Sequence, residues 1–127
     1  MMSHESRDET LLQHQKGLIT ALKILDLWGI GEADQGFILN IDRDLLNSSE
    51  VLNGLTERQL LKISYILNIH ASLRELFQNP ENFYGFMQAV NHNSPYCGRT
   101  PSDFVVTGEL DSLKKVFESL ERLKYGQ

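Results

Sequence analysis

The single cysteine of the chain, Cys97, and His92 five residues before it are residues whose types could form a nucleophilic pair. A histidine base can deprotonate a cysteine thiol, and the thiolate can then attack a carbonyl carbon. That chemistry also needs a group that orients the histidine and donors that stabilise an oxyanion, and the sequence makes neither evident. A lone cysteine in a small helical protein usually packs as a small apolar residue. We therefore expect Cys97 to be a packing residue and expect no catalytic residues.

The histidines do not indicate a metal site either. Histidine ligands on one helix commonly stand four residues apart or in an H-E-x-x-H motif, and neither spacing occurs among His4, His14, His70 and His92. One cysteine excludes a multi-cysteine zinc cage, and no glycine-rich loop follows a strand pattern, as a phosphate-binding loop would. We expect no metal, no cofactor and no enzymatic activity. His70, which follows Ile69 in a helical pattern, is expected to be a core or flanking histidine.

Turn-forming residues are concentrated between residues 93 and 110, which hold two of the three prolines and two of the nine glycines. Thr100 and Asp103 have the spacing of a capping box, and Pro101 occupies the first helical position. Gly98 and Gly108 let the chain turn sharply on either side of the short helix. The sequence thus predicts two tight corners, with structural roles for Asn93, Gly98, Thr100, Pro101, Asp103 and Gly108.

Four residues are not required by this folding scheme: Tyr96, Arg99, Lys124 and Tyr125. An arginine beside a rigid corner is a common recognition group, although a solvated surface arginine is the alternative interpretation of Arg99. We therefore expect these residues to contact a partner.

Helical periodicity organises the remainder of the chain, with apolar residues three and four positions apart. We predict helices over residues 8–27, 32–39 and 42–52, a long helix from the Thr56 cap to about 77, one after Asn79-Pro80, a short one after Thr100, and a last one from about 110 to 124. The predicted buried stripes of the two helices that flank the short one are Phe83, Phe86, Met87 and Val90, and Leu110, Leu113, Val116, Phe117, Leu120 and Leu123. We find no repeat and no convincing strand, so the sequence predicts an all-α fold.

Composition places the chain among globular proteins. It has 127 residues, of which 41% are hydrophobic and 23% charged, and 127 residues are enough for one domain or two small helical lobes. The polar start has no apolar signal-peptide core, no apolar run has the length of a membrane span, and one cysteine fits a reducing compartment. We therefore expect a cytoplasmic protein.

Residues 18–54 have the outline of a helix-turn-helix unit, in which a longer helix precedes two short ones, although any packing corner in a small bundle can produce that outline. Residues 1–54 carry four Lys or Arg against nine Asp or Glu, so the whole net charge of −5 lies in them. Because Lys and Arg neutralise the phosphates, an acidic lobe disfavours DNA binding. Arg43, Asn47 and Ser48 remain the candidate DNA-binding residues.

The run from Asn93 to Leu123 resembles the C-terminal toxin-binding domain of Xre/MbcA/ParS-type antitoxins. That family shows an Asn, an aromatic or large apolar residue two before a Gly, then Gly-Arg-Ser/Thr-Pro, a short apolar helix, and Gly-Glu/Asp-Leu before the last helix. The corresponding residues are Asn93, Tyr96, Gly98-Arg99-Thr100-Pro101, Phe104-Val105-Val106 and Gly108-Glu109-Leu110, preceded by the break Leu76-Phe77-Gln78-Asn79-Pro80. The resemblance covers roughly residues 18–125.

The resemblance implies an Xre-like helix-turn-helix lobe over 1–54 and a toxin-binding domain over 55–127. Such proteins are antitoxins of bacterial type II toxin–antitoxin pairs, commonly beside a RES-domain toxin that degrades NAD; they occlude the toxin's active site, tend to dimerise, and often repress their own operon. Little chain follows the last helix, so we expect toxin binding to involve that helix and the Arg99 corner. The expected toxin-binding residues are Tyr96, Arg99, Leu120, Lys124 and Tyr125. The alternative is a DNA-binding transcriptional regulator without a toxin partner.

Overall fold

The computed structural model describes residues 4–42 and 54–126, which form six helices and no strand, so this part of the chain is all-α as predicted. The helices are α1 (His4–Leu27), α2 (Glu32–Leu39), α4 (Glu57–Leu76), α5 (Glu81–Gln88), α6 (Pro101–Val105) and α7 (Leu110–Lys124). The predicted helix over 42–52, the second half of the helix-turn-helix outline, and Arg43, Asn47 and Ser48 lie outside the described residues.

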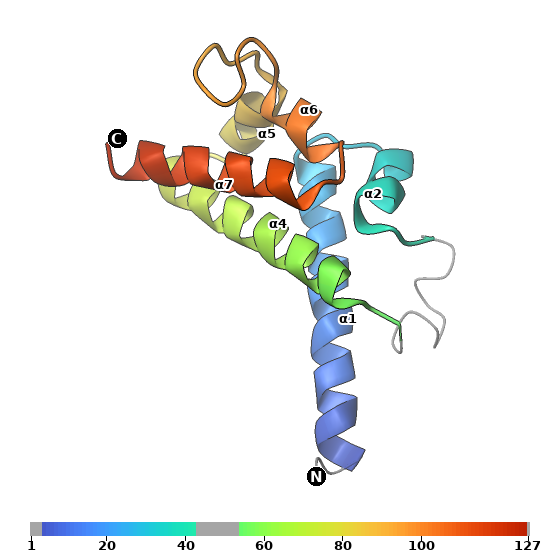
Figure 1. The fold of residues 1–127 in the computed structure, drawn as a ribbon. Coiled ribbons are helices and arrows are strands. Elements are labelled where there is room, and N and C mark those ends of the chain that lie inside the picture. Colours follow the sequence, from blue (N-terminus) through green and yellow to red (C-terminus); the bar gives the residue numbers. More distant parts are fainter. Residues whose placement is uncertain (1–3, 43–53, 127) are drawn as a thin grey trace.

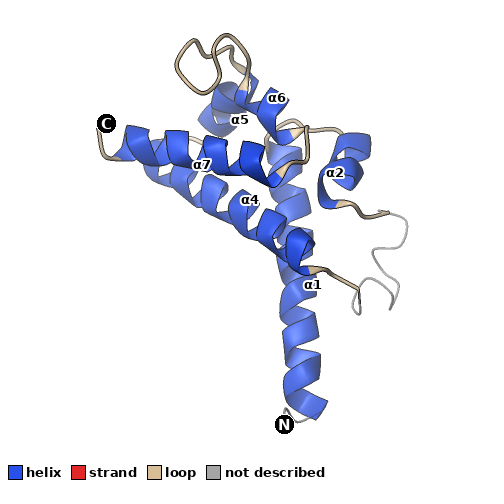
Figure 2. Cartoon of the chain, in the orientation of Figure 1, coloured by secondary structure: helices blue, strands red, loops and turns tan. Residues whose placement is uncertain are grey.

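Helices α4 and α7 lie side by side and form the most extensive helix contact, as Figure 1 shows. Ser72 contacts Glu121 and Glu75 contacts Lys124, so the two helices run parallel. The crossover that parallel helices require is made by α5 and α6, which pack on each other, and α6 also packs on α7 (Figure 2). The C-terminal half of α1 packs against α4, while its N-terminal half extends away from the other helices.

One hydrophobic core joins all of these helices. It contains fully buried Trp28 from the end of α1, Ile38 from α2, Ile66 from α4 and Leu113 from α7. Burying an aliphatic side chain of this size stabilises the fold by about 1.5–3 kcal/mol. The two segments that the sequence divides at residue 54 therefore share a core.

Local capping ends α2 and begins α4, and the predicted Thr56 cap is confirmed. Asn40 adopts the left-handed conformation, with φ 54°, and ends α2. Thr56 Oγ1 accepts a hydrogen bond from the Gln59 backbone N–H at 3.1 Å, and Gln59 Oε1 accepts one from the Thr56 N–H at 2.8 Å. Helix α5 has Pro80 as its N-cap residue, and the side-chain oxygen of Asn79 just before it accepts a hydrogen bond from the Glu81 N–H at 3.1 Å.

Side chains of α4 satisfy the carbonyl groups at the end of α2. Lys62 Nζ donates to the Ile38 carbonyl at 2.8 Å, and Gln59 Nε2 donates to the Leu39 and Asn40 carbonyls at 3.0 Å each. The last carbonyls of a helix have no intrahelical partner and carry partial negative charge, so an ammonium group and an amide are favourable there. Burial, and secondarily the charge of Arg58, lower the pKa of Lys62.

His70 is half-buried, as expected, and supports the core from α4. Its Nδ1 accepts a hydrogen bond from the Trp28 indole at 3.4 Å, and its ring meets Phe83 edge-on with the ring centres 5.2 Å apart. Burial and the nearby Arg74 lower the pKa of His70, which favours the neutral ring that this hydrogen bond requires.

The predicted apolar stripes are correct at their centres and wrong at their ends. Phe83, Met87, Leu113 and Val116 are buried, but Val90 is 57% exposed and Leu123 is 52% exposed. Val90 follows the end of α5, and Leu123 lies in the last turn of α7. Helix α1 also begins at His4, earlier than the predicted residue 8.

The double use of Gln59 yields a test of the α2–α4 link. Glutamate serves a capping box as well as glutamine does, so Gln59→Glu keeps the cap but replaces the amide donor with a carboxylate facing two carbonyls. We expect this variant to lower the free energy of unfolding by about 1–3 kcal/mol, measured by urea denaturation. The same change at exposed Gln78 is the matched control and is expected to stay within about 0.5 kcal/mol. Equal stability of the two variants would contradict the assigned link.

Candidate functional site

Residues 91–99, here called the corner loop, form a loop closed at its base. The Asn91 N–H donates to the Arg99 carbonyl at 3.0 Å, and the Gly98 N–H donates to the Asn91 carbonyl at 2.8 Å. Within the loop the Asn93 carbonyl accepts hydrogen bonds from the N–H groups of Tyr96 and Cys97. Cys97 and Gly98 both have positive φ, 49° and 96°, so the sharp reversal falls where the sequence places a glycine.

The short helix after the corner loop is capped as predicted. Thr100 Oγ1 accepts from the Asp103 N–H at 3.0 Å, and Asp103 Oδ2 accepts from the Thr100 N–H at 2.9 Å, with Pro101 at the start of α6. Gly108 has φ 70°, and a Cβ atom there would lie 3.3 Å from the Ile38 Cα, so a side chain is disfavoured by both conformation and space. The predicted capping box, the proline at the start of the short helix, and the turns at Gly98 and Gly108 are therefore confirmed.

Tyr96 is a core residue, which corrects the expectation that folding does not require it. Its side chain is 1% exposed, and its ring meets Phe104 edge-on at 5.2 Å between centres. Its hydroxyl is hydrogen-bonded to Ser119 of α7. The single Ser119 hydroxyl hydrogen is donated to the Val116 carbonyl at 2.8 Å, so the Tyr96 hydroxyl is the donor to Ser119.

Burial raises the pKa of Tyr96, while the Ser119 hydrogen bond and the positive charge of Arg122 act in the opposite direction. The phenol therefore stays protonated at neutral pH and keeps its donor role. The buried Tyr96 side chain therefore anchors the corner loop to α7.

Arg99 is exposed, and its guanidinium lies over the Phe104 ring at 4.6 Å from the centroid. The Phe104 ring thus packs edge-on against Tyr96 and also makes a cation–π contact with Arg99. A cation–π contact at an exposed site contributes about 0.5–1 kcal/mol and restricts the side chain. Arg99 is consequently presented to solvent in an ordered position.

Leu120 and Lys124 occupy structural positions, which corrects the expectation that they are free for a partner. Leu120 is fully buried. Lys124 Nζ lies 2.9 Å from carboxylate oxygens of both Glu75 on α4 and Glu121 on α7, and the Ser72 hydroxyl donates to Glu121 at 2.8 Å. These contacts join the ends of the two parallel helices. The hydrogen bond to Glu121 is the main cause that raises the pKa of Lys124, and the same bond lowers the pKa of Glu121.

Tyr125, in contrast, is 69% exposed at the end of α7, and Lys124 Nζ lies 5.6 Å from its ring centre. Of the five expected toxin-binding residues, the structure therefore places Arg99 and Tyr125 at the surface.

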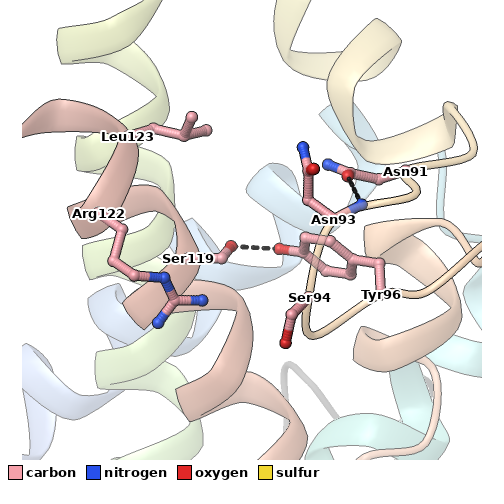
Figure 3. A pocket seen from close by; sticks show the side chains of 7 residues that line it. All are labelled: Asn91, Asn93, Ser94, Tyr96, Ser119, Arg122 and Leu123. Atoms are coloured by element: carbon pink, nitrogen blue, oxygen red, sulfur yellow. Dashed lines mark hydrogen bonds between the residues drawn. The ribbon is translucent and has the colours of Figure 1, made fainter. Parts of the chain in front are cut away.

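A pocket of about 350 Å³ opens between the corner loop and the last turns of α7. Side chains from the loop and from the helix face each other across it, as Figure 3 shows. It is lined by Asn91, Asn93, Ser94, Tyr96, Ser119, Arg122 and Leu123. The sequence alone predicts Asn93 only as a corner residue, and it does not indicate Asn91, Ser94, Ser119 or Arg122 as site residues. The helical spacing offers one indication of the pocket: Arg122 follows Ser119 by three residues, so the two side chains lie on the same face of α7.

Cys97 is exposed, so the expectation that it fills the core is wrong. It lies in the corner loop with a positive φ of 49°, directly before Gly98. Within residues 4–42 and 54–126, no three His, Cys, Asp or Glu side chains gather as a metal site would require. No helix in these ranges has the length and apolar character needed to cross a membrane.

Comparisons of the chain with protein-family models, with curated proteins and with solved structures returned no match.

The buried hydroxyl of Tyr96 yields a second prediction. Tyr96→Phe keeps the ring and removes the donor to Ser119, so we expect the free energy of unfolding to fall by about 0.5–1.5 kcal/mol. Tyr84→Phe, at a tyrosine that is 53% exposed, is the matched control and is expected to be neutral. A double-mutant cycle with Ser119→Ala isolates the pairwise contribution. The hydrogen bond would be refuted as a stabilising contact if Tyr96→Phe were as neutral as the control and the cycle were additive.

Proposed function

We propose that this protein is the antitoxin of a bacterial type II toxin–antitoxin pair, which binds its cognate toxin and occludes the toxin's active site. The observation that carries the proposal is that the Gly98-Arg99-Thr100-Pro101 run, the most distinctive part of the resemblance, forms a rigid corner beside an open pocket on α7. The residues that resemble the antitoxin motif thus lie next to the pocket between the corner loop and α7.

The composition of this surface supports a protein partner. Arg99 and Arg122 are exposed, and Leu123 and Tyr125 expose more than half of their side chains. Arginine and tyrosine are enriched among the residues that dominate binding energy at protein interfaces. The Asn91–Arg99 backbone pair connects the Arg99 corner to the pocket, because Asn91 lines the pocket.

The rigidity of the corner supports inhibition by occupancy. A loop closed by backbone hydrogen bonds and anchored through Tyr96 loses little conformational entropy on binding, which favours affinity. Inhibition by occupancy requires no catalysis by this chain. We propose a RES-domain NAD-degrading toxin as the partner and a homodimeric antitoxin. The net charge of −5 in residues 1–54 disfavours operon autoregulation through DNA binding by this lobe.

Co-expression with the neighbouring gene product tests the proposal. We expect the neighbour to arrest growth alone, to be harmless when this chain is present, and to co-purify with it. Arg99→Ala is expected to weaken the complex about 10- to 100-fold in Kd, as truncation of a central interface arginine commonly does. Urea denaturation of the same variant measures the loss of the Phe104 contact, which is expected to be about 1 kcal/mol or less.

Lys114→Ala, at an exposed position near the other end of α7, is the control and is expected to leave the complex unchanged. Failure of any neighbouring product to bind or to be neutralised would remove the antitoxin proposal. If no neighbouring product binds and this chain alone binds its upstream promoter specifically and with salt sensitivity, the transcriptional regulator is favoured instead.

A further inference from the structure

The pocket between the corner loop and α7 presents hydrogen-bond donors that the described part of the chain leaves without acceptors. No described residue forms an ion pair or a hydrogen bond with the Arg122 guanidinium. The same holds for the side chains of Asn93 and Ser94, both exposed. Figure 3 shows these side chains around the opening of the pocket.

The acidic residues closest to Arg122 in sequence do not neutralise it. Glu121 accepts a hydrogen bond from Ser72 of α4 and forms an ion pair with Lys124 of its own helix. Glu118, one turn before Arg122, is exposed and forms no ion pair with Arg122. The pocket is therefore positively charged locally, although the whole chain carries −5.

The chemistry of these groups selects a carboxylate. A guanidinium binds a carboxylate through two parallel hydrogen bonds, and the Asn93 amide and Ser94 hydroxyl can donate to its remaining lone pairs. A phosphate, with up to two negative charges, is usually held by more than one basic group, whereas Arg122 is the only Lys or Arg among the pocket-lining residues. Leu123 and the Tyr96 ring supply apolar walls for methylene groups.

We infer that this pocket receives the carboxylate of an acidic side chain on the partner protein. The inference rests on the proposed function for the identity of the partner, and on Asn93, Ser94 and Arg122 for the chemistry. The volume of about 350 Å³ is large enough to admit a glutamate or aspartate side chain with part of its backbone.

A titration of the chain alone tests the chemistry. The probe is N-acetyl-glutamate N-methylamide, and the neutral N-acetyl-glutamine N-methylamide is the matched control. In ¹⁵N-correlated NMR spectra we expect the glutamate probe, at millimolar concentrations, to shift the Arg122 Nε–H and Asn93 side-chain signals saturably. We expect the glutamine probe to leave them in place, and Arg122→Gln to abolish the response while Arg74→Gln, at an exposed site on α4, retains it.

Equal responses to both probes, or a response that persists in Arg122→Gln, would overturn the inference. Free succinate that binds at least 100-fold more tightly than the glutamate probe would also overturn it, because the pocket would then serve a small dicarboxylate.

A measurement on the complex tests the partner. We expect Arg122→Gln to raise the Kd of the toxin complex about 10- to 100-fold and Arg122→Lys to recover part of that loss. Unchanged toxin binding in Arg122→Gln would contradict the inference even where toxin neutralisation itself is confirmed. The probe titration uses no toxin, so its failure is distinguishable from a failure of the co-expression experiment.

Discussion

A buried tyrosine hydroxyl must find a hydrogen-bond partner, and this requirement fixes how the corner loop is placed on the rest of the protein. Leaving such a group without a partner costs about 1–3 kcal/mol. Tyr96 is 1% exposed, and Ser119 on α7 supplies the acceptor. Once Tyr96 is anchored, Phe104 packs against it and Arg99 lies over Phe104. The buried Tyr96–Ser119 hydrogen bond therefore helps to position the exposed Arg99 guanidinium, because Phe104 contacts both Tyr96 and Arg99.

The same physical rule explains how the other helices are joined. The carbonyl groups that α2 cannot satisfy internally accept hydrogen bonds from Gln59 and Lys62 of α4. At the other end of α4, Lys124 lies between two carboxylates and links α4 to α7. Because α4 is linked to α2 near its N-terminal end and to α7 near its C-terminal end, the surface formed by α7 and the corner loop has a fixed base. A rigid, partly cationic surface suits recognition of a preformed protein surface.

Local interactions could be predicted from the sequence, and long-range ones could not. The capping boxes of Thr56 and Thr100 involve residues three positions apart, so their spacing reveals them. The apolar stripes gave the helices and most of the core. Nothing local indicates that Tyr96 reaches Ser119, 23 residues later, or that Lys124 reaches Glu75 on another helix. The sequence therefore predicts partner contacts for Tyr96 and Lys124, which the fold uses, and it does not indicate Arg122, which lines the pocket.

Native-state hydrogen exchange tests most directly whether the corner loop is part of the cooperative core. The Asn91 and Gly98 amides, which close the loop by hydrogen bonds of 3.0 and 2.8 Å, report on it. The account predicts that they exchange with a free energy close to that of the buried half of α7, and that Tyr96→Phe lowers both together. Rapid exchange of these two amides through local opening, while α7 stays protected, would contradict the claim that Tyr96 makes loop and helix one unit.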